Sequence, residues 1–243
     1  MRKGSERAGE DPLELQHAAF VEDHRVEIGG VDPSLIRSIP NPIDLDEFTP
    51  PIARGLFRQR FGLGTGPVVL FLGKVTPRKR LDVLVRAFAR LRSDARLVLA
   101  GNDMGGAACA RALVRSLGIE PRTLFTGLLK GRDRLEALAD AEVLVYPSQN
   151  EIFGLVPLEA LLCGTPVVVA DDSGCGEIVQ GVGGGQVVPL GDAAALARAI
   201  DAVLTSPTGW REAASIAAGR VRTLYSGDVV STQLEQMYAE MIE

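Results

Sequence analysis

Hydrophobic positions form a regular rhythm from residue 67 to the end of the chain. Short apolar or β-branched runs, most of which end at Gly, Pro or Asn, alternate with longer segments whose apolar residues recur at helical spacing. The short runs are VVLFLG, RLVLAG, TLFTG, VLVYP, PVVVA and QVVP. Such alternation predicts an α/β fold with six parallel strands in one doubly wound, Rossmann-like sheet that is covered by helices on both faces. Ligands of such sheets bind beyond the carboxyl ends of the strands.

The helical segments follow the strands in turn. They are RLDVLVRAFARL, ACARALVRSLG, RLEALADA, LEALLCG and DAAALARAIDAVL, with GWREAASIAAGRV and DVVSTQLEQMYAEMI after the last strand. We therefore expect residues 67–243 to form one domain that ends in two helices.

The first 66 residues lack this rhythm. Residues 1–33 are irregular, with one candidate short helix, LELQHAAFVEDHR, and we expect residues 1–30 to be mobile. Residues 34–66 predict a short strand, a Pro-rich extended segment and a short helix, a composition that suits an interdomain linker.

Composition narrows the possible partners and compartments. The net charge of −5 gives no reason to expect nucleic acid as a partner, so a cationic site must be local. Cys109, Cys163 and Cys175 are odd in number and scattered, which favours a reducing cytosol over a disulfide framework. The N-terminus has no apolar core of a secretory signal, and no apolar run reaches the roughly 18 residues of a membrane span.

Several common sites are missing from the sequence. It has neither the G-x-x-x-x-G-K-[ST] loop nor, after its first strand, the G-x-G-x-x-G of dinucleotide enzymes. His17 and His24 are the only histidines, and both lie in the irregular segment, which argues against Ser-His-Asp catalysis and histidine-bound metal. The glycines at 181–185 precede a strand, so a surface turn is the preferred interpretation.

Two aspartate pairs are candidate metal ligands. Asp44-Leu45-Asp46 spells Asp-x-Asp but lies in the Pro-rich segment, so we interpret it as a turn and helix-entry feature. Asp171-Asp172 follows a strand without a third ligand nearby, which favours capping of the next helix over metal binding.

The segment GKVTPRKRLDVL places cations around a predicted helix start. Thr76 can serve as N-cap, with Pro77 at the first helical position. Arg78, Lys79 and Arg80 would then lie in the first turn, where the helix dipole disfavours cations, and Lys74 precedes them. This arrangement favours an anion site, with diphosphate as the candidate, over a solvated helix face.

The segment EIFGLVPLE, residues 151–159, predicts a second anion cradle. Its helix should begin near Gly154 and stop at Gly164, and free N–H groups near Phe153 to Leu155 would face a phosphate. Glu159, one turn further along, could accept hydrogen bonds from both hydroxyls of a ribose. Glu151, in the loop before the helix, would face what is attached beyond the phosphates. The alternative is a solvated loop glutamate, a core Phe and a surface glutamate; the cationic segment upstream weighs against it.

At these residues the sequence resembles the retaining, GT-B-fold, nucleotide-sugar-dependent glycosyltransferases. This group includes sucrose synthase, bacterial glycogen synthase and many mannosyl- and glucosyltransferases. The resemblance extends from about Ser34 to the C-terminus and depends most on the Glu-x7-Glu element of EIFGLVPLE together with the upstream lysines. Other matching segments are IPNPIDLDEF, RLVLAGN, LFTGLL, DSGCGEIV and GQVVPLGDAAALARAI.

The resemblance implies a role for each site residue. Lys74 and Lys79, with Gly73 beside them, would bind the donor diphosphate. The backbone of Phe153, Gly154 and Leu155 would meet the phosphates, Glu159 the ribose, and Glu151 the transferred sugar as the residue nearest the reacting carbon. The loop from Gly127 to Lys130 would lie by the nucleobase.

The sequence also departs from the family pattern. Pro42 and Arg80 replace usual glycines, and DSGCGE stands where many members have Gly-Gly-x-Pro-Glu. Only the donor half of the two Rossmann-like halves is present, so the isolated chain is expected to be an incomplete enzyme. The last helix resembles one that crosses back onto the other half, so its apolar face should be exposed or find a partner.

The resemblance implies a retaining hexosyltransferase, and together with the composition it predicts a cytoplasmic protein, peripheral to a membrane only through a partner. Its donor would be a UDP-, GDP- or ADP-linked sugar, its acceptor a saccharide or lipid, and it would need no cofactor or metal. The acceptor-binding half would be an N-terminal domain or a separate chain. One alternative is a non-catalytic nucleotide-sugar-binding subunit for a separate acceptor-binding chain. A GT-B epimerase is a further alternative, which the Glu-x7-Glu element disfavours.

Overall fold

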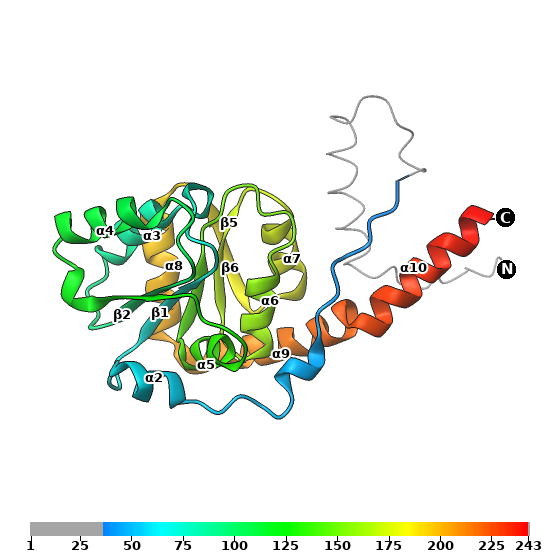
Figure 1. Ribbon diagram of the computed structural model, residues 1–243, viewed down its shortest axis with the longest axis horizontal. Helices are drawn as coiled ribbons and strands as arrows, with labels where there is room; N and C mark the ends of the chain where they lie inside the picture. The colour runs from blue at the N-terminus through cyan, green and yellow to red at the C-terminus, as the bar shows by residue number, and fades with distance from the viewer. Residues whose placement is uncertain (1–35, 243) are drawn as a thin grey trace, which may run out of the picture.

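The six predicted strands form one parallel sheet in a computed structural model that describes residues 36–242 (Figure 1). Their order in the sheet is β3-β2-β1-β4-β5-β6, which is that of a doubly wound fold. The predictions for residues 1–35, including those for His17 and His24, lie outside the described residues. The strands are β1 (Val68–Leu72), β2 (Arg96–Ala100), β3 (Thr123–Gly127), β4 (Val143–Tyr146), β5 (Val167–Asp171) and β6 (Gly185–Pro189).

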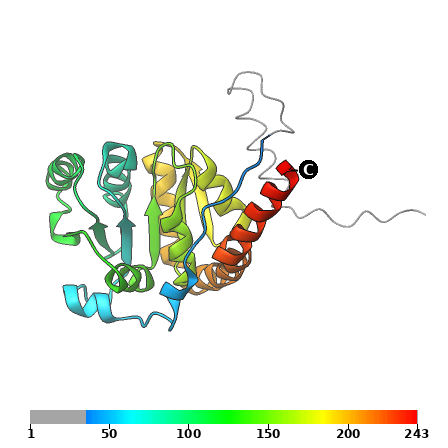
Figure 2. The same cartoon turned by 45° about the vertical axis from the view of Figure 1, so that its right-hand side comes forward.

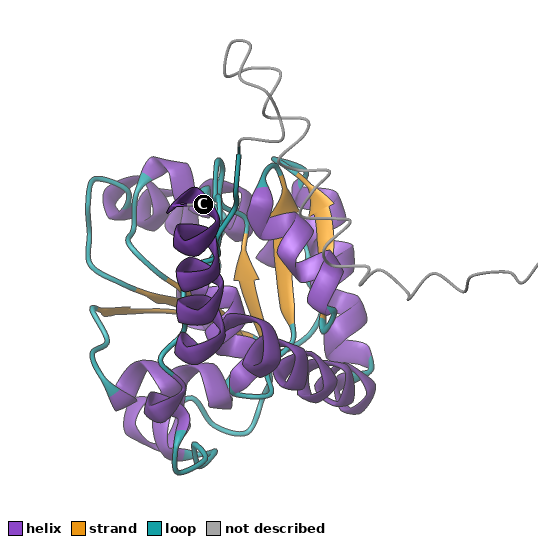
Figure 3. Ribbon diagram, turned by 90° about the vertical axis from the view of Figure 1, so that its right-hand side faces the viewer, coloured by secondary structure: helices purple, strands orange, loops and turns teal. Residues whose placement is uncertain are grey.

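Helices cover both faces of the sheet, as the alternating pattern predicts (Figure 3). On one face α3 (Leu81–Phe88) packs against α4 (Ala107–Ser116) and α8 (Ala193–Thr205). The other face carries α5 (Arg132–Asp140), α6 (Leu155–Leu162) and α7 (Gly174–Val182), with α9 (Pro207–Tyr225) lying over α6. The chain changes face between β3 and β4, so the central strands are enclosed by helices on both sides.

Burial on both faces explains why the central strands read as continuous apolar runs. Every residue of β1 and β4 is buried. In β5 only the last residue, Asp171, is exposed. A strand that packs on both faces cannot alternate apolar with polar residues, since either face would then bury unpaired polar groups.

The linker is anchored to the domain at two places. Asp44 caps the short 3-10 helix η2 (Leu45–Phe48) by accepting a hydrogen bond from Asp46 N at 3.0 Å, as the turn interpretation of Asp44-Leu45-Asp46 predicts. Ile43 N donates to Tyr225 O at 2.8 Å. The helix predicted before the sheet is α2 (Leu56–Phe61). The strand predicted at the start of the linker does not form over residues 36–39, where no neighbouring strand supplies a partner within the described chain.

The last helix, α10 (Gly227–Ile242), leaves the domain beside linker residues 36–42, as Figures 1 and 2 both show. Arg37 Nε lies 3.7 Å from Glu240 Oε2. Val230 is the one buried residue of α10 within the described chain. Leu234, Tyr238, Met241 and Ile242 form an exposed apolar stripe at helical spacing, in agreement with the exposed face expected for this helix.

Candidate functional site

Both predicted phosphate-binding segments lie at the carboxyl edge of the sheet, where the strand order reverses. β1 leads into Lys74–Arg80 and β4 leads into Gln149–Gly154, and these two strands are neighbours. The loops are joined directly, because Gln149 N donates to Arg78 O at 2.8 Å. In open α/β sheets this reversal is where ligands bind, since the loops on its two sides diverge and leave a crevice.

The first loop differs from the predicted helix start. Thr76 precedes a separate 3-10 helix, η3 (Pro77–Lys79), and makes no side-chain cap hydrogen bond within the described residues. Arg80 then adopts a left-handed conformation with φ of 48°, and α3 begins only after it. The prediction that Thr76 caps the long helix is therefore wrong, because the left-handed residue at 80 separates the two helices. The glycine that the resemblance leads us to expect at this position would adopt that backbone without strain.

The four cations of this segment have different surroundings. Arg80 pairs with Asp82, with its Nε and Nη2 atoms 3.1 and 3.2 Å from the carboxylate oxygens. Arg78 Nη2 donates to Asn150 O at 2.7 Å. Lys79 pairs with Glu151, and Lys74 is exposed. Arg78, Lys79 and Arg80 thus all interact with protein groups, so a phosphate that binds Lys79 would have to compete with Glu151.

Lys79, Tyr146 and Glu151 form one polar cluster across β1 and β4. Lys79 Nζ pairs with Glu151 Oε2 and donates to the Tyr146 hydroxyl at 2.5 Å. The same hydroxyl lies 3.3 Å from Glu151 Oε2, and Nζ lies 4.4 Å from the centre of the tyrosine ring. Burial and the nearby Glu151 carboxylate raise the pKa of Tyr146, so the phenol stays protonated and can donate to the carboxylate.

The loop that carries Glu151 is held from the end of β5. Asn150, in a left-handed conformation with φ of 52°, donates its backbone N–H to the Asp172 carboxylate. Ser173 Oγ donates to Glu151 O at 2.7 Å. The prediction that Asp171-Asp172 caps the next helix is wrong: Ser173 is the N-cap of α7, and Asp172 instead turns toward the Glu151 loop, which needs an acceptor for Asn150 N. Residues 36–242 contain no cluster of three metal-ligating side chains.

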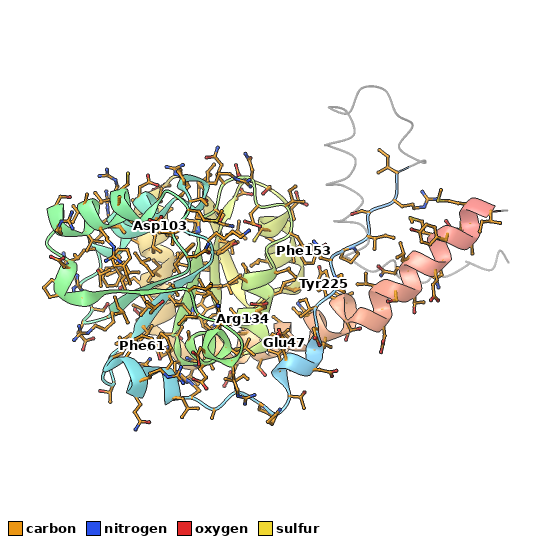
Figure 4. The ribbon with its side chains drawn as sticks, in the orientation of Figure 1. Glu47, Phe61, Asp103, Arg134, Phe153 and Tyr225 are labelled. Carbon is orange, nitrogen blue, oxygen red and sulfur yellow. The ribbon has the colours of Figure 1, made fainter. Side chains whose placement is uncertain are left out.

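Gly154 begins α6, as the sequence predicts. It is the left-handed N-cap of the helix, and no side chain caps this end within the described residues. A β-carbon at Gly154 would lie 2.4 Å from the sulfur of buried Cys175, so a larger residue cannot pack there. Burial raises the pKa of Cys175 to about 12, so this thiol stays neutral. Phe153 packs edge-on against Tyr225 at 5.5 Å, which ties the loop to the end of α9 (Figure 4).

Glu159 points toward a second polar cluster. Arg134 of α5 places Nη1 3.2 Å from Glu159 Oε2 and also pairs with Glu47 of η2. Burial raises the pKa of Glu159, Arg134 lowers it and Glu47 raises it. Gly127, at the end of β3, and Lys130, in the loop that follows, are both predicted to lie by the nucleobase, and both are exposed.

Sequence reasoning missed three residues that contact the predicted site. In the sequence, Tyr146 has the pattern of a strand residue and Arg134 that of an ordinary helix residue. Asp172 has the pattern of a helix cap. The sequence offers little local signal for them, because their partners are 5 to 87 residues away along the chain. One clue is the polar hydroxyl that Tyr146 brings to the last position of an otherwise aliphatic strand.

The doubly wound sheet places the chain in the Rossmann-like α/β class, of the kind found in GT-B proteins. The family model for glycosyl transferases group 1 matches residues 54–220, so the chain belongs to this family. A D-inositol 3-phosphate glycosyltransferase from Xylanimonas cellulosilytica is 34% identical over 88% of this chain and 54% of its own. One of the same name from Salinispora arenicola is 32% identical over 96% and 57%. The chain thus spans about half the length of these relatives.

Solved structures with the same fold agree with this assignment. Sucrose-phosphate synthase from Thermosynechococcus elongatus superimposes with a TM-score of 0.77 at 30% identity, over 94% of this chain and 57% of its own. HepE from Anabaena, solved with UDP and glucose, superimposes with a TM-score of 0.77 over 94% of this chain and 67% of its own. At 20% identity that likeness shows the fold alone. Among the described residues, no helix is long and apolar enough to cross a membrane.

Proposed function

We propose that this chain is the donor-binding domain of a glycosyltransferase that uses a nucleoside diphosphate sugar and retains the anomeric configuration. The contact between Lys79 and Glu151 at the strand-order reversal carries the proposal. In a nucleotide sugar, the diphosphate and the sugar meet at one C–O–P linkage. A cation for the phosphate and a carboxylate for the sugar must therefore lie side by side, as these two do. Family membership and the names of the relatives support the same function.

The proposed roles follow the charge that develops as the donor bond breaks. When the anomeric C–O bond is cleaved, negative charge builds up on the leaving diphosphate. Lys79, Lys74 and the uncapped N–H groups at the start of α6 would stabilise that charge. The departing phosphate oxygen would take the proton of the acceptor hydroxyl while the new glycosidic bond forms on the same face of the sugar. Glu151 would orient the sugar rather than attack it, because its carboxylate is already paired with Lys79.

Other residues along the crevice are proposed to bind the remaining parts of the donor. Glu159 would bind the ribose diol, and the loop from Gly127 to Lys130 would border the nucleobase. The acceptor and the part of the enzyme that positions it would come from an acceptor-binding half, as a domain or a separate chain. Since the relatives are about twice as long as the matched region, the proposal leaves room for such a half.

Calorimetric titration of the chain with UDP, GDP, ADP and pyrophosphate tests the proposal. At least one nucleoside diphosphate should bind, because both phosphate-binding segments and the ribose carboxylate belong to this one domain. Lys79→Ala should weaken that binding and pyrophosphate binding about 10- to 100-fold through loss of a charge-assisted contact. Arg80→Ala is the control, since Arg80 pairs with Asp82 and should change affinity little. Absence of binding by all four ligands would refute the proposal.

A further inference from the structure

A guanidinium group from α5 lies beside the carboxylate to which we assign the ribose. The Nη1 atom of Arg134 is 3.2 Å from Glu159 Oε2, and its Nη2 atom pairs with Glu47. These three side chains come from the linker, from α5 and from α6, and Figure 4 shows Arg134 and Glu47 facing each other where the first two meet. No nucleotide-binding motif of the sequence includes Arg134.

Burial of the Arg134 guanidinium destabilises the fold unless its charge is compensated by the neighbouring carboxylate. Nη1 is buried and makes no hydrogen bond within residues 36–242. A buried donor without a partner destabilises the folded state. The negative charge of Glu159 offsets that burial, and Nη1 contacts the carboxylate at Oε2. A carboxylate held through one oxygen can accept hydrogen bonds from a ligand with the other.

A buried ribose site needs its carboxylate ionised. The two hydroxyls of a ribose are both donors, and an ionised carboxylate can accept from both, whereas a protonated carboxyl carries a donor of its own. The Glu159 side chain is only 17% exposed, so desolvation opposes ionisation. A fixed cation nearby counteracts this effect.

We propose that Arg134 is the positioning residue for the ribose-binding carboxylate of Glu159, holding it ionised and with one oxygen free for the diol. This inference rests on the proposed donor-binding function and adds a residue to it. Glu47 holds the second nitrogen of the same guanidinium, so the linker orients Arg134 without taking it away from Glu159.

The effect of removing Arg134 on the pKa of Glu159 depends on the other charged and titratable groups near this carboxylate. They are Glu47 from η2, Arg134 from α5 and Cys163 at the C-terminal end of α6, with Arg222 of α9 near Cys163. Burial raises the pKa of the Cys163 thiol to about 12, so it stays neutral. Without Arg134, Glu159 would face Glu47 with less compensation, and its pKa would rise further. A larger fraction of the carboxyl would then be protonated at any given pH, and that fraction would fall as the pH increases.

The test compares a nucleoside diphosphate with its dideoxy counterpart, which lacks both ribose hydroxyls. The nucleotide is whichever of UDP, GDP and ADP binds wild-type protein most tightly. Arg134→Met should weaken its binding about tenfold near pH 6 and less near pH 8.5, because loss of the cation raises the pKa of Glu159 and a higher pH favours the ionised carboxylate. Affinities for the dideoxy nucleotide and for pyrophosphate should change less than about twofold at either pH. Arg134→Lys, which keeps a cation, should recover most of the loss.

Two controls separate positioning from a structural role. Arg132→Met removes an exposed arginine of the same helix and should leave every affinity unchanged. Glu47→Gln breaks the other ion pair of Arg134 and should also retain nucleotide affinity. If Glu47→Gln reproduces the Arg134→Met loss, the arginine acts by holding the linker, and the inference is wrong. Equal losses for the nucleotide and its dideoxy counterpart would also overturn it. If wild-type protein binds no nucleotide, the proposed function fails instead.

Discussion

At the scale of single residues, the candidate site holds two opposite charges, Lys79 and Glu151, in direct contact. Lys79 and Glu151 are partly buried, with 15% and 23% of their side chains exposed, so each would be costly to bury alone. They compensate each other, and the protonated Tyr146 hydroxyl between them bonds to both. A phosphate that approaches Lys79 therefore competes with a carboxylate that is itself proposed to bind the sugar. In the proposed function, the pair would therefore couple binding of the phosphate to binding of the sugar.

Arg80 occupies a left-handed backbone position that favours glycine. Its φ of 48° is strained for any residue with a β-carbon, and its ion pair with Asp82 lies at the surface, where such pairs contribute little.

The strain at Arg80 leads to a prediction on stability. Arg80→Gly relieves it, whereas Arg80→Ala keeps it and loses the pair with Asp82. We expect the glycine variant to be about 1 kcal/mol more stable than the alanine variant in urea unfolding. The opposite order would mean that residue 80 is not left-handed in solution.

At the scale of elements, the site depends on one loop clamped between its neighbours. The segment that carries Glu151 receives Arg78 from the loop after β1 and Asp172 from the end of β5. Gly154 and Phe153 then pack it against α7 and the end of α9. The loop around Glu151 belongs to neither a helix nor a strand, so these contacts, and not regular backbone hydrogen bonds, hold its conformation.

Loss of the Asp172 clamp should loosen this loop selectively. Asp172→Ala removes the acceptor of Asn150 N, at a cost of about 1 kcal/mol in unfolding free energy. Hydrogen exchange should accelerate over residues 149–152, while β4 and β5 stay protected. Asp171→Ala, at the exposed end of β5, is the matched control and should leave the loop unchanged. Equal exchange in both variants would show that Arg78 and Ser173 suffice to hold the loop.

At the scale of the whole molecule, residues 36–242 form one domain from which the last helix, α10, extends. α9 buries Ala214, Ala217, Val221 and Tyr225 against the domain and belongs to its core. α10 beyond Val230 has no such anchor among residues 36–242, and its apolar stripe faces solvent beside the linker.

Hydrogen exchange should distinguish these two helices. Amides of α9 should exchange together with those of β1, β4 and β5, because they share one core and open in the same unfolding event. Amides of α10 after Val230 should exchange at least about 100-fold faster, since an isolated helix of this length is marginal in water. Protection of α10 equal to that of α9 would indicate that its apolar stripe is covered in solution, for example by a second copy of the chain.

The sequence by itself determined the sheet, most of its helices and the pair of segments at its carboxyl edge. These features follow from local periodicity, from glycines at helix ends and from the order of strands, which topology rules limit to few arrangements. The tertiary structure decided which charges are left for a ligand. Arg78 and Asp172 turned to the Glu151 loop, and Glu159 acquired Arg134 and Glu47 as neighbours. Such partners are distant in the sequence, and a side chain's choice among them depends on burial and geometry that no local pattern contains.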